Sequence, residues 1–78
     1  MNFGGALAVL KAGGRVARTG WNGKGMWLLL QEPTLASLMT LPYLYLNYPQ
    51  GSAAYPQGAR VPWLASQTDL LAEDWEAV

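Results

Sequence analysis

Apolar side chains near the start of the chain recur at helical spacing. Phe3, Leu7 and Leu10 are separated by four and three residues, which is typical of the buried stripe of an amphipathic helix. The asparagine before Phe3 is a favourable N-cap, and Lys11 followed by Gly13 is a typical stop signal. The pattern predicts an N-terminal helix that lies on a sheet.

Short apolar runs bounded by glycine or proline predict the strands. Residues Arg15–Arg18 and Met26–Leu30 are too short for helices, and the glycine-rich bend Gly20–Gly25 joins them. Leu41–Asn47 alternates tyrosine with leucine at the two-residue period of a strand. Trp75–Val78 either extends a preceding helix or, as we expect, returns as a terminal strand.

The remaining segments predict connections and a second, short helix. Pro33–Thr40 is expected to be a loop that allows one helical turn. The segment Tyr48–Gly58 carries Tyr-Pro-Gln-Gly twice and is expected to be a surface excursion between two strands. Ser66 precedes Asp69 by three residues, as in a capping box, and predicts a helix over Gln67–Glu73. The predicted fold class is α+β: a small antiparallel β-sheet with an N-terminal helix and a short helix near the C-terminus.

Composition limits what such a chain can do. A chain of 78 residues corresponds to one domain, residues 1–78, with a small core. Its charged fraction of 13% is about half the usual share, so we expect exposed apolar surface on a monomer and therefore a homo-oligomer. The absence of cysteine and histidine excludes disulfides, thiolate chemistry and imidazole catalysis or ligation.

The formal charges balance overall but not along the chain. Five basic and five acidic residues give no net field for a long polyanion, so a DNA-binding role is not expected. Four basic residues lie in the first third and four acidic residues in the last ten, so we expect the two ends to attract each other, within one subunit or between two. No apolar run approaches the ~20 residues of a membrane span, and no signal peptide is visible, which indicates a cytoplasmic protein.

The tryptophans are the leading candidates for ligand-binding residues. Trp21 stands inside the glycine-rich bend, where a ligand can approach the backbone closely, and Trp63 borders a predicted loop. An indole can fill a small core, or it can stack on a nucleobase, which contributes about 1 to 3 kcal/mol per base. The residues themselves leave both roles open.

Polar side chains near these indoles suit a binding pocket. Neutral donors and acceptors are supplied by Asn22, Ser66, Gln67 and Thr68, although ordinary turn and cap bonding is the favoured interpretation of Ser66. Basic side chains can bind phosphates. The competing interpretation is that they form a solvated face of the protein. These basic residues are Arg15, Arg18, Lys24 and Arg60.

Catalysis is not expected. Asp69 and Glu73 are four residues apart and share one face if the second helix reaches Glu73, an arrangement that can divide acid and base roles or hold a divalent cation. Such pairs are more often solvated helix surface, and no nucleotide-binding loop or nucleophile elbow accompanies them. We therefore predict no catalytic residue, no metal site and no cofactor.

Three segments carry a resemblance that covers nearly the whole chain. The opening "MNFGGALAVLKAGGRVARTGWNGKGMWLLL", the central "MTLPYLYL" and the closing "VPWLASQTDLLAEDWEAV" resemble a family of short phage proteins, the second Thoeris anti-defence family. The pairing of "GWNGKG" with "PWLASQTDLLAEDW" is the specific part. The double Tyr-Pro-Gln-Gly segment is longer than the turn expected in the family at that place.

The resemblance implies a sponge for a nucleotide signal in the host bacterial cytoplasm. Members of the family sequester the cyclised ADP-ribose signal of Thoeris immunity without degrading it, and some also hold cyclic oligonucleotide messengers (CBASS signals) in a separate pocket. They are homo-oligomers, typically tetramers, with pockets at subunit interfaces. By resemblance, and for the arginines by their charge, the ligand-binding residues are Trp21, Asn22, Lys24, Trp63, Ser66, Gln67, Asp69, Phe3, Arg18 and Arg60.

Two other functions compete with the sponge. A cyclic-nucleotide hydrolase would release a chemically changed ligand, whereas a sponge returns it intact. A small structural phage assembly protein would use its apolar faces for assembly and bind no nucleotide at all.

Overall fold

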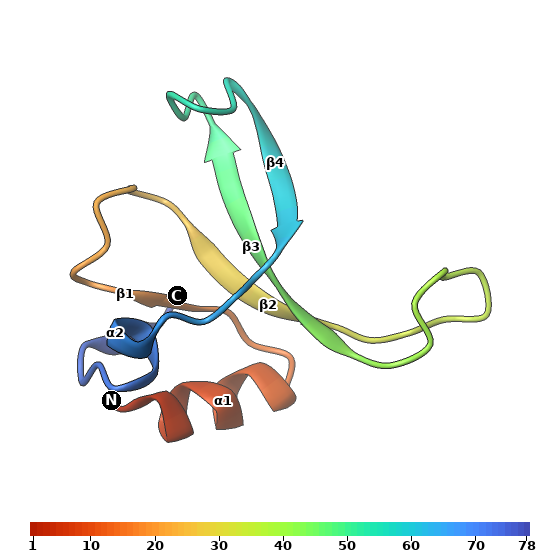
Figure 1. The fold of residues 1–78 in the computed structure, drawn as a ribbon, viewed down its shortest axis with the longest axis horizontal. Helices are drawn as coiled ribbons and strands as arrows, with labels where there is room; N and C mark the ends of the chain where they lie inside the picture. Colours follow the sequence, from red (N-terminus) through yellow and green to blue (C-terminus); the bar gives the residue numbers. More distant parts are fainter.

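An antiparallel five-stranded sheet carries a nine-residue helix on one face (Figure 1). The computed structural model describes residues 1–78. The predicted α+β class, with one helix at the start and a short one near the end, is confirmed. The elements in chain order are α1 (Phe3–Lys11), β1 (Val16–Arg18), β2 (Trp27–Gln31), β3 (Tyr43–Gln50), β4 (Gln57–Pro62), α2 (Gln67–Leu70) and β5 (Trp75–Ala77).

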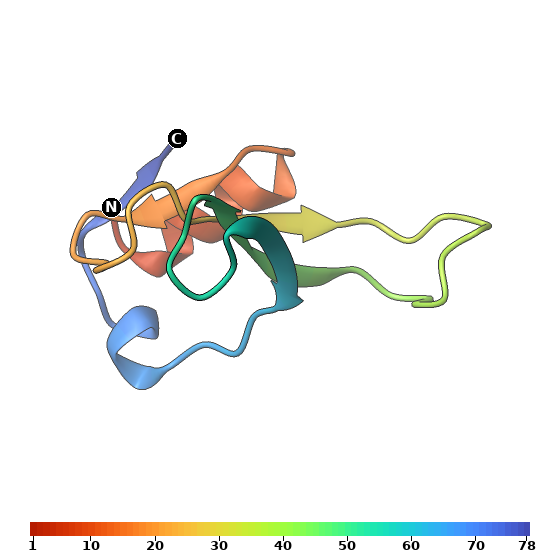
Figure 2. The same cartoon turned by 90° about the horizontal axis from the view of Figure 1, so that it is seen from above.

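The strand order β4-β3-β2-β1-β5 brings the end of the chain back to its beginning. Strand β5 pairs with β1, with Ala17 opposite Glu76, so the predicted terminal strand is confirmed. The backbone N–H of Trp75 donates to the carbonyl of Met1 at 3.1 Å, which places the first residue beside the last strand (Figure 2). Segments from opposite ends of the sequence therefore share one end of the sheet.

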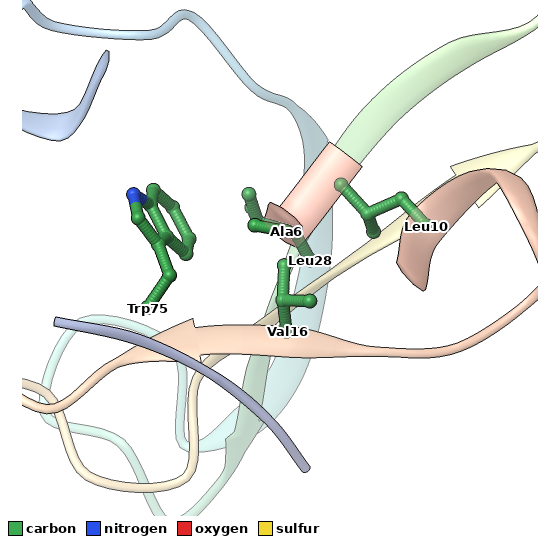
Figure 3. Packing of buried hydrophobic residues seen from close by; sticks show 5 residues of the cluster. All are labelled: Ala6, Leu10, Val16, Leu28 and Trp75. Carbon is green, nitrogen blue, oxygen red and sulfur yellow. The ribbon is translucent and has the colours of Figure 1, made fainter. Parts of the chain in front are cut away.

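The core lies between α1 and the sheet face beneath it. Ala6 and Leu10 of the helix meet Val16, Leu28 and Trp75 of three neighbouring strands, and all five are buried (Figure 3). The predicted helical stripe is confirmed, because its other members pack against the edge of this cluster. Only seven residues of the chain are buried, so the core is as small as the length predicts.

Local signals set the ends of α1 as predicted. The side chain of Asn2 accepts a hydrogen bond from the N–H of Gly5 at 2.9 Å, which satisfies one of the free donors of the first turn. Lys11 lies in the last turn, and Gly13 follows with φ of 92°. A left-handed residue just after a helix is where glycine is favoured.

The second helix is shorter than predicted. It ends at Leu70 and not at Glu73, so Asp69 and Glu73 do not share a helical face. The indole N–H of Trp75 donates to the carbonyl of Asp69 at 2.9 Å, and that carbonyl would accept from Glu73 in a continuing helix. The chain leaves the helix early because Trp75 must reach the core and β5 must pair with β1.

The hairpin of β3 and β4 is longer than predicted, and the excursion is shorter. Strand β3 starts at Tyr43 and continues to Gln50, so only residues 51–56 connect it to β4. Pro49 stands inside the strand, opposite Gly58, which has φ of 82°. A Cβ at Gly58 would lie 3.1 Å from the carbonyl oxygen of Tyr48, so this place in the hairpin requires glycine.

The connection between β2 and β3 extends away from the rest of the molecule in both views (Figures 1 and 2). We call residues 32–42 the projecting loop. It contains one hydrogen-bonded turn, in which the N–H of Ser37 donates to the carbonyl of Thr34 at 3.1 Å, in the segment where a loop with a turn was expected. Neither helix has the length and apolar character that a membrane span requires.

Candidate functional site

The glycine-rich bend between β1 and β2 is anchored at its start and open at its tip. The backbone N–H of Thr19 donates to the carbonyl of Asp74 at 3.1 Å, and the N–H of Gly20 donates to its carboxylate at 2.8 Å. Asn22 and Lys24, further along, are exposed. The bend therefore presents these side chains from a fixed starting point.

An ion-pair network lies at the start of the bend. Arg18 donates through Nη1 to Asp69 and through Nε to Asp74, each at 2.8 Å. The attraction predicted between the basic first third and the acidic end is thus found within one chain. The three side chains are 14 to 33% exposed, so the network is largely shielded from water.

The network shifts the ionisation of its members. The hydrogen bonds to Asp74 and then to Asp69 raise the pKa of Arg18, and the bond from Arg18 lowers the pKa of Asp74. Burial raises the pKa of Asp69, but hydrogen bonds from Arg18, Trp21 and Ser66 outweigh it and hold this pKa below its ordinary value. All three groups are charged at neutral pH.

Four aromatic rings pack together beside the network. The ring of Trp75 lies 5.4 Å from that of Trp21, 6.0 Å from that of Trp63 and 5.3 Å from that of Phe3, all edge to face. The indole N–H of Trp21 donates to Asp69 at 3.2 Å. The packing role considered for the tryptophans therefore holds for Trp21 and Trp63, and Phe3 shares it.

Two clefts flank the bend. One, of about 180 Å³, lies between Trp21, Lys24 and Trp27, and the other, of about 420 Å³, lies between Asn22, Lys24 and the end of the β3–β4 hairpin at Tyr48. Lys24 borders both clefts. Small-molecule sites in proteins usually occupy about 300 to 1,000 Å³, so the larger cleft is of that size and the smaller one is not.

A family model for the Thoeris anti-defense 2-like domain matches residues 1–78. The chain belongs to this family. A curated relative, Thoeris anti-defense 2 of Bacillus phage SP01, is 45% identical over 84 residues, which cover 100% of this chain and 94% of the relative. The resemblance expected from the sequence is thus confirmed, and this Thoeris anti-defense 2-like chain is related to phage anti-defence proteins.

The structure gathers part of the expected site of this Thoeris anti-defense 2-like chain. Trp21, Asn22 and Lys24 line the clefts at the bend, and Arg18 also borders the smaller one, whereas Asp69 borders neither. The resemblance does not distinguish these residues. Their geometry does, because the polar atoms of Arg18 and Asp69 are engaged in the ion-pair network and those of the exposed Asn22 and Lys24 are not.

The other expected residues lie elsewhere. Ser66 accepts the N–H of Asp69 at 3.1 Å and so serves as the cap of α2, while Gln67 is exposed beside it. Arg60 lies on β4, donates to Asn47 at 3.3 Å and borders a separate open cleft of about 470 Å³ along the hairpin. The structure contains no group of three acidic, cysteine or histidine residues that could hold a metal ion.

Sequence reasoning missed the far wall of the larger cleft. Tyr48 and Pro49 reach the bend because β2 and β3 pair in register, and a Cβ at Gly25 would lie 3.3 Å from Cγ of Pro49. The sequence predicts a surface excursion for the first Tyr-Pro-Gln-Gly copy, and the structure places its first two residues in β3. The available signal is the two-residue period, in which Leu44 and Leu46 lead to Tyr48 on the same side of the strand.

Proposed function

We propose that residues 1–78 form a single binding domain that captures a cyclised ADP-ribose signal of the Thoeris system. In this proposal the homo-oligomeric protein sequesters the signal uncleaved in the host bacterial cytoplasm. The anti-defence name of the relative and of the family supports it. The observation that carries it is the bend, where Lys24 borders two clefts and an indole and an amide stand beside it.

Each part of such a ligand has a suitable group at the bend. The ammonium of Lys24 is a point charge for the pyrophosphate, and the amide of Asn22 can donate to and accept from ribose hydroxyls. The outer part of the half-buried Trp21 ring offers an apolar surface to a base. A dissociation constant between micromolar and nanomolar requires about 8 to 12 kcal/mol, within reach of such contacts in a preformed cleft.

Asp69 has a positioning role in this proposal. One carboxylate oxygen accepts both Nη1 of Arg18 and the indole N–H of Trp21, so it fixes the indole relative to the bend. Direct contact with a ligand would require that oxygen to give up these donors. We therefore assign ligand contact to Trp21, Asn22 and Lys24, and support of Trp21 to Asp69.

Capture without cleavage suits the chemistry of the clefts. No carboxylate borders the larger cleft, and Glu76 is the one that borders the smaller cleft. Hydrolysis of a cyclic nucleotide needs a positioned base or a metal ion to activate water. Binding alone needs neither.

Native mass spectrometry with cyclic ADP-ribose isomers and cyclic di- and trinucleotides tests the proposal. We expect one ligand class to bind, and Lys24→Gln or Asn22→Ala to weaken binding at least tenfold. Lys11→Gln is the matched control, because Lys11 is also an exposed lysine but lies at the end of α1. Equal losses in Lys24→Gln and Lys11→Gln would contradict a site at the bend.

Heating the complex and weighing the released ligand tests the absence of cleavage. A sponge returns the ligand with unchanged mass, whereas a hydrolase returns a product. Failure of every nucleotide to bind would favour the assembly protein. Binding of a cyclic oligonucleotide alone would keep a sponge but change its ligand class.

A further inference from the structure

An asparagine followed by a glycine lies at the tip of the bend. Asn22 and Gly23 are both exposed, and no other Asn-Gly pair occurs in the chain. The side-chain carbonyl carbon of an asparagine can be attacked by the backbone nitrogen of the next residue. Glycine hinders this attack least, because it has no side chain and the widest choice of backbone conformations. The tip of the bend therefore carries the sequence in which an asparagine side chain is most open to this reaction.

The fold does not restrain this pair. The last backbone hydrogen bond before it runs from the N–H of Trp21 to the carbonyl of Arg18 at 3.2 Å, and strand β2 begins only at Trp27. Neither the side-chain amide of Asn22 nor the backbone N–H of Gly23 forms a hydrogen bond within the chain. Exposed segments without such bonds open locally at little cost in free energy. The pair is thus free to reach the geometry in which the nitrogen meets the side chain.

The two other asparagines of the chain are held in place. The side-chain oxygen of Asn2 accepts the N–H of Gly5 at 2.9 Å, and that of Asn47 accepts from Arg60 at 3.3 Å across the β3–β4 pairing. Each is followed by a bulky aromatic residue inside a helix or a strand. These two asparagines therefore serve as internal controls for Asn22.

We propose that Asn22 deamidates spontaneously through Gly23 and that the resulting carboxylate disables the bend as a site for an anionic ligand. The backbone nitrogen of Gly23 loses its proton to solvent and forms a bond to Cγ of Asn22. The bond from Cγ to the amide nitrogen breaks, and that nitrogen leaves as ammonia after taking a proton from solvent.

Water then opens the succinimide ring that this step forms. The hydroxyl of water joins one of the ring's carbonyl carbons, and the ring nitrogen takes up a proton as its bond to that carbon breaks. Opening at Cγ leaves aspartate, and opening at the backbone carbonyl carbon leaves isoaspartate, in which the chain runs through the former side chain. Overall, water enters and ammonia leaves, so the reaction needs no oxidant, reductant or metal ion.

Either product places a negative charge on the wall of the larger cleft. Asn22 and Lys24 both border this cleft of about 420 Å³, and no carboxylate of the unmodified chain does. A carboxylate beside Lys24 offsets the charge of its ammonium and repels a phosphate. Isoaspartate also adds a carbon to the backbone and so moves Lys24 relative to Trp21. This consequence for binding rests on the proposed function, but the deamidation does not.

Peptide mapping by mass spectrometry tests the reaction in the absence of nucleotide. Folded protein is incubated at mildly alkaline pH, and the same protein in urea gives the rate of the unfolded chain. We expect Asn22 of the folded protein to convert to aspartate and isoaspartate at least tenfold faster than Asn2 and Asn47. If Asn22 stayed intact in the folded protein while it converted in urea, the fold would protect it and the proposal would be overturned.

Gly23→Ala is the matched control. Gly23 does not have a positive φ, and a Cβ there would lie 2.7 Å from the end of the Met26 side chain, which is flexible and can shift. The added methyl group should slow the conversion of Asn22 at least tenfold while Asn22 stays in the bend. Equal rates in Gly23→Ala and wild type would contradict a reaction through this backbone nitrogen.

Titration with cyclic ADP-ribose isomers before and after the same incubation tests the consequence for binding. We expect the wild type to lose binding in proportion to its deamidated fraction and Gly23→Ala to keep it. Asn22→Asp should bind at least tenfold more weakly than Asn22→Ala at low salt, because it adds repulsion to the loss of the amide, and added salt should narrow this difference.

The outcomes separate the deamidation from the proposed function. Equal binding by the deamidated and intact fractions would overturn the consequence for binding, even where Asn22→Ala binds weakly. A wild type that binds no nucleotide before incubation would refute the proposed function, and the consequence for binding with it. The peptide map contains no nucleotide, so it decides the deamidation in either case.

Discussion

Leu28 and Leu29 are neighbours in β2, yet they face different surroundings. Leu28 is fully buried beneath α1 with Val16 and Trp75, on what we call the covered face of the sheet, whereas Leu29 is only half-buried on the opposite face. The opposite face also buries Tyr45, which is 7% exposed and lies under the guanidinium of Arg60. Apolar side chains therefore pack on both faces of the sheet, beneath a helix on one and beneath an arginine on the other.

The charges on the two faces differ in the same way. Arg18, beside the covered face, is held by two carboxylates of the same chain. Arg15 and Arg60, on the opposite face, lie over aromatic rings without a carboxylate partner. Paired charge thus accompanies the core beneath α1, and unpaired charge accompanies the aromatic rings of the other face.

The largest expected contrast comes from truncating the two leucines. Leu28→Ala leaves a cavity in a core of five residues and should cost about 2 to 5 kcal/mol of unfolding free energy. Leu29→Ala removes only partly buried surface and should cost about 1 kcal/mol. Urea unfolding followed by tryptophan fluorescence measures both losses. Similar losses of unfolding free energy in both variants would remove the distinction between the faces.

The next effect concerns the ion-pair network beside the covered face. The pKa values of Asp69 and Asp74 in the folded protein are lowered from 3.8, so the unfolded chain binds protons first as the pH falls. Their stabilisation is complete above the unfolded pKa and is lost as the pH falls through the lower, folded pKa. We expect the melting temperature to drop below about pH 4, and Asp69→Asn to lower it by about 5 °C at pH 7 while flattening its acid dependence.

A matched variant separates this network from surface charge in general. Glu73→Gln removes one carboxylate from the same acidic segment, but Glu73 is exposed and forms no ion pair. Its melting temperature should stay near the wild-type value at each pH. An Asp69→Asn curve that coincided with the Glu73→Gln curve would show that the network does not stabilise the fold.

The comparison also explains how much of the fold could be predicted. The N-cap at Asn2 and the helical stripe above Leu10 depend on neighbours within a few residues, and both were predicted. The end of α2 was not, because the indole of Trp75 takes the carbonyl that would continue the helix. The end of β3 was missed for a related reason: Tyr48 and Gln50 are in the strand because they pair with Ala59 and Gln57, which follow a turn. Features that depend on residues close in sequence could be predicted, and these element ends, which depend on distant residues, could not.

The residues of the candidate site also differ in how far they could be predicted from nearby sequence. A bend around Trp21 and Lys24 follows from the glycines, so its exposed tip was predictable. The bond from the Trp21 indole to Asp69 joins residues 48 positions apart, and nothing near either residue indicates it. Tyr48 reaches the larger cleft only through the register of three strands. The residues that support or enclose the site therefore needed the structure.

The smallest expected effect concerns the unpaired arginines. An exposed guanidinium over an aromatic ring contributes about 0.5 to 1 kcal/mol. Arg15→Ala should therefore lower the unfolding free energy of dilute protein by that amount, and Arg60→Ala by less, because its guanidinium is 0.9 Å further from the ring centre (5.8 − 4.9 Å). A double-mutant cycle of Arg15→Ala with Trp27→Leu isolates the contact between the two side chains. A coupling energy near zero would mean that Arg15 merely rests over the indole, and its charge would then be unengaged within the chain.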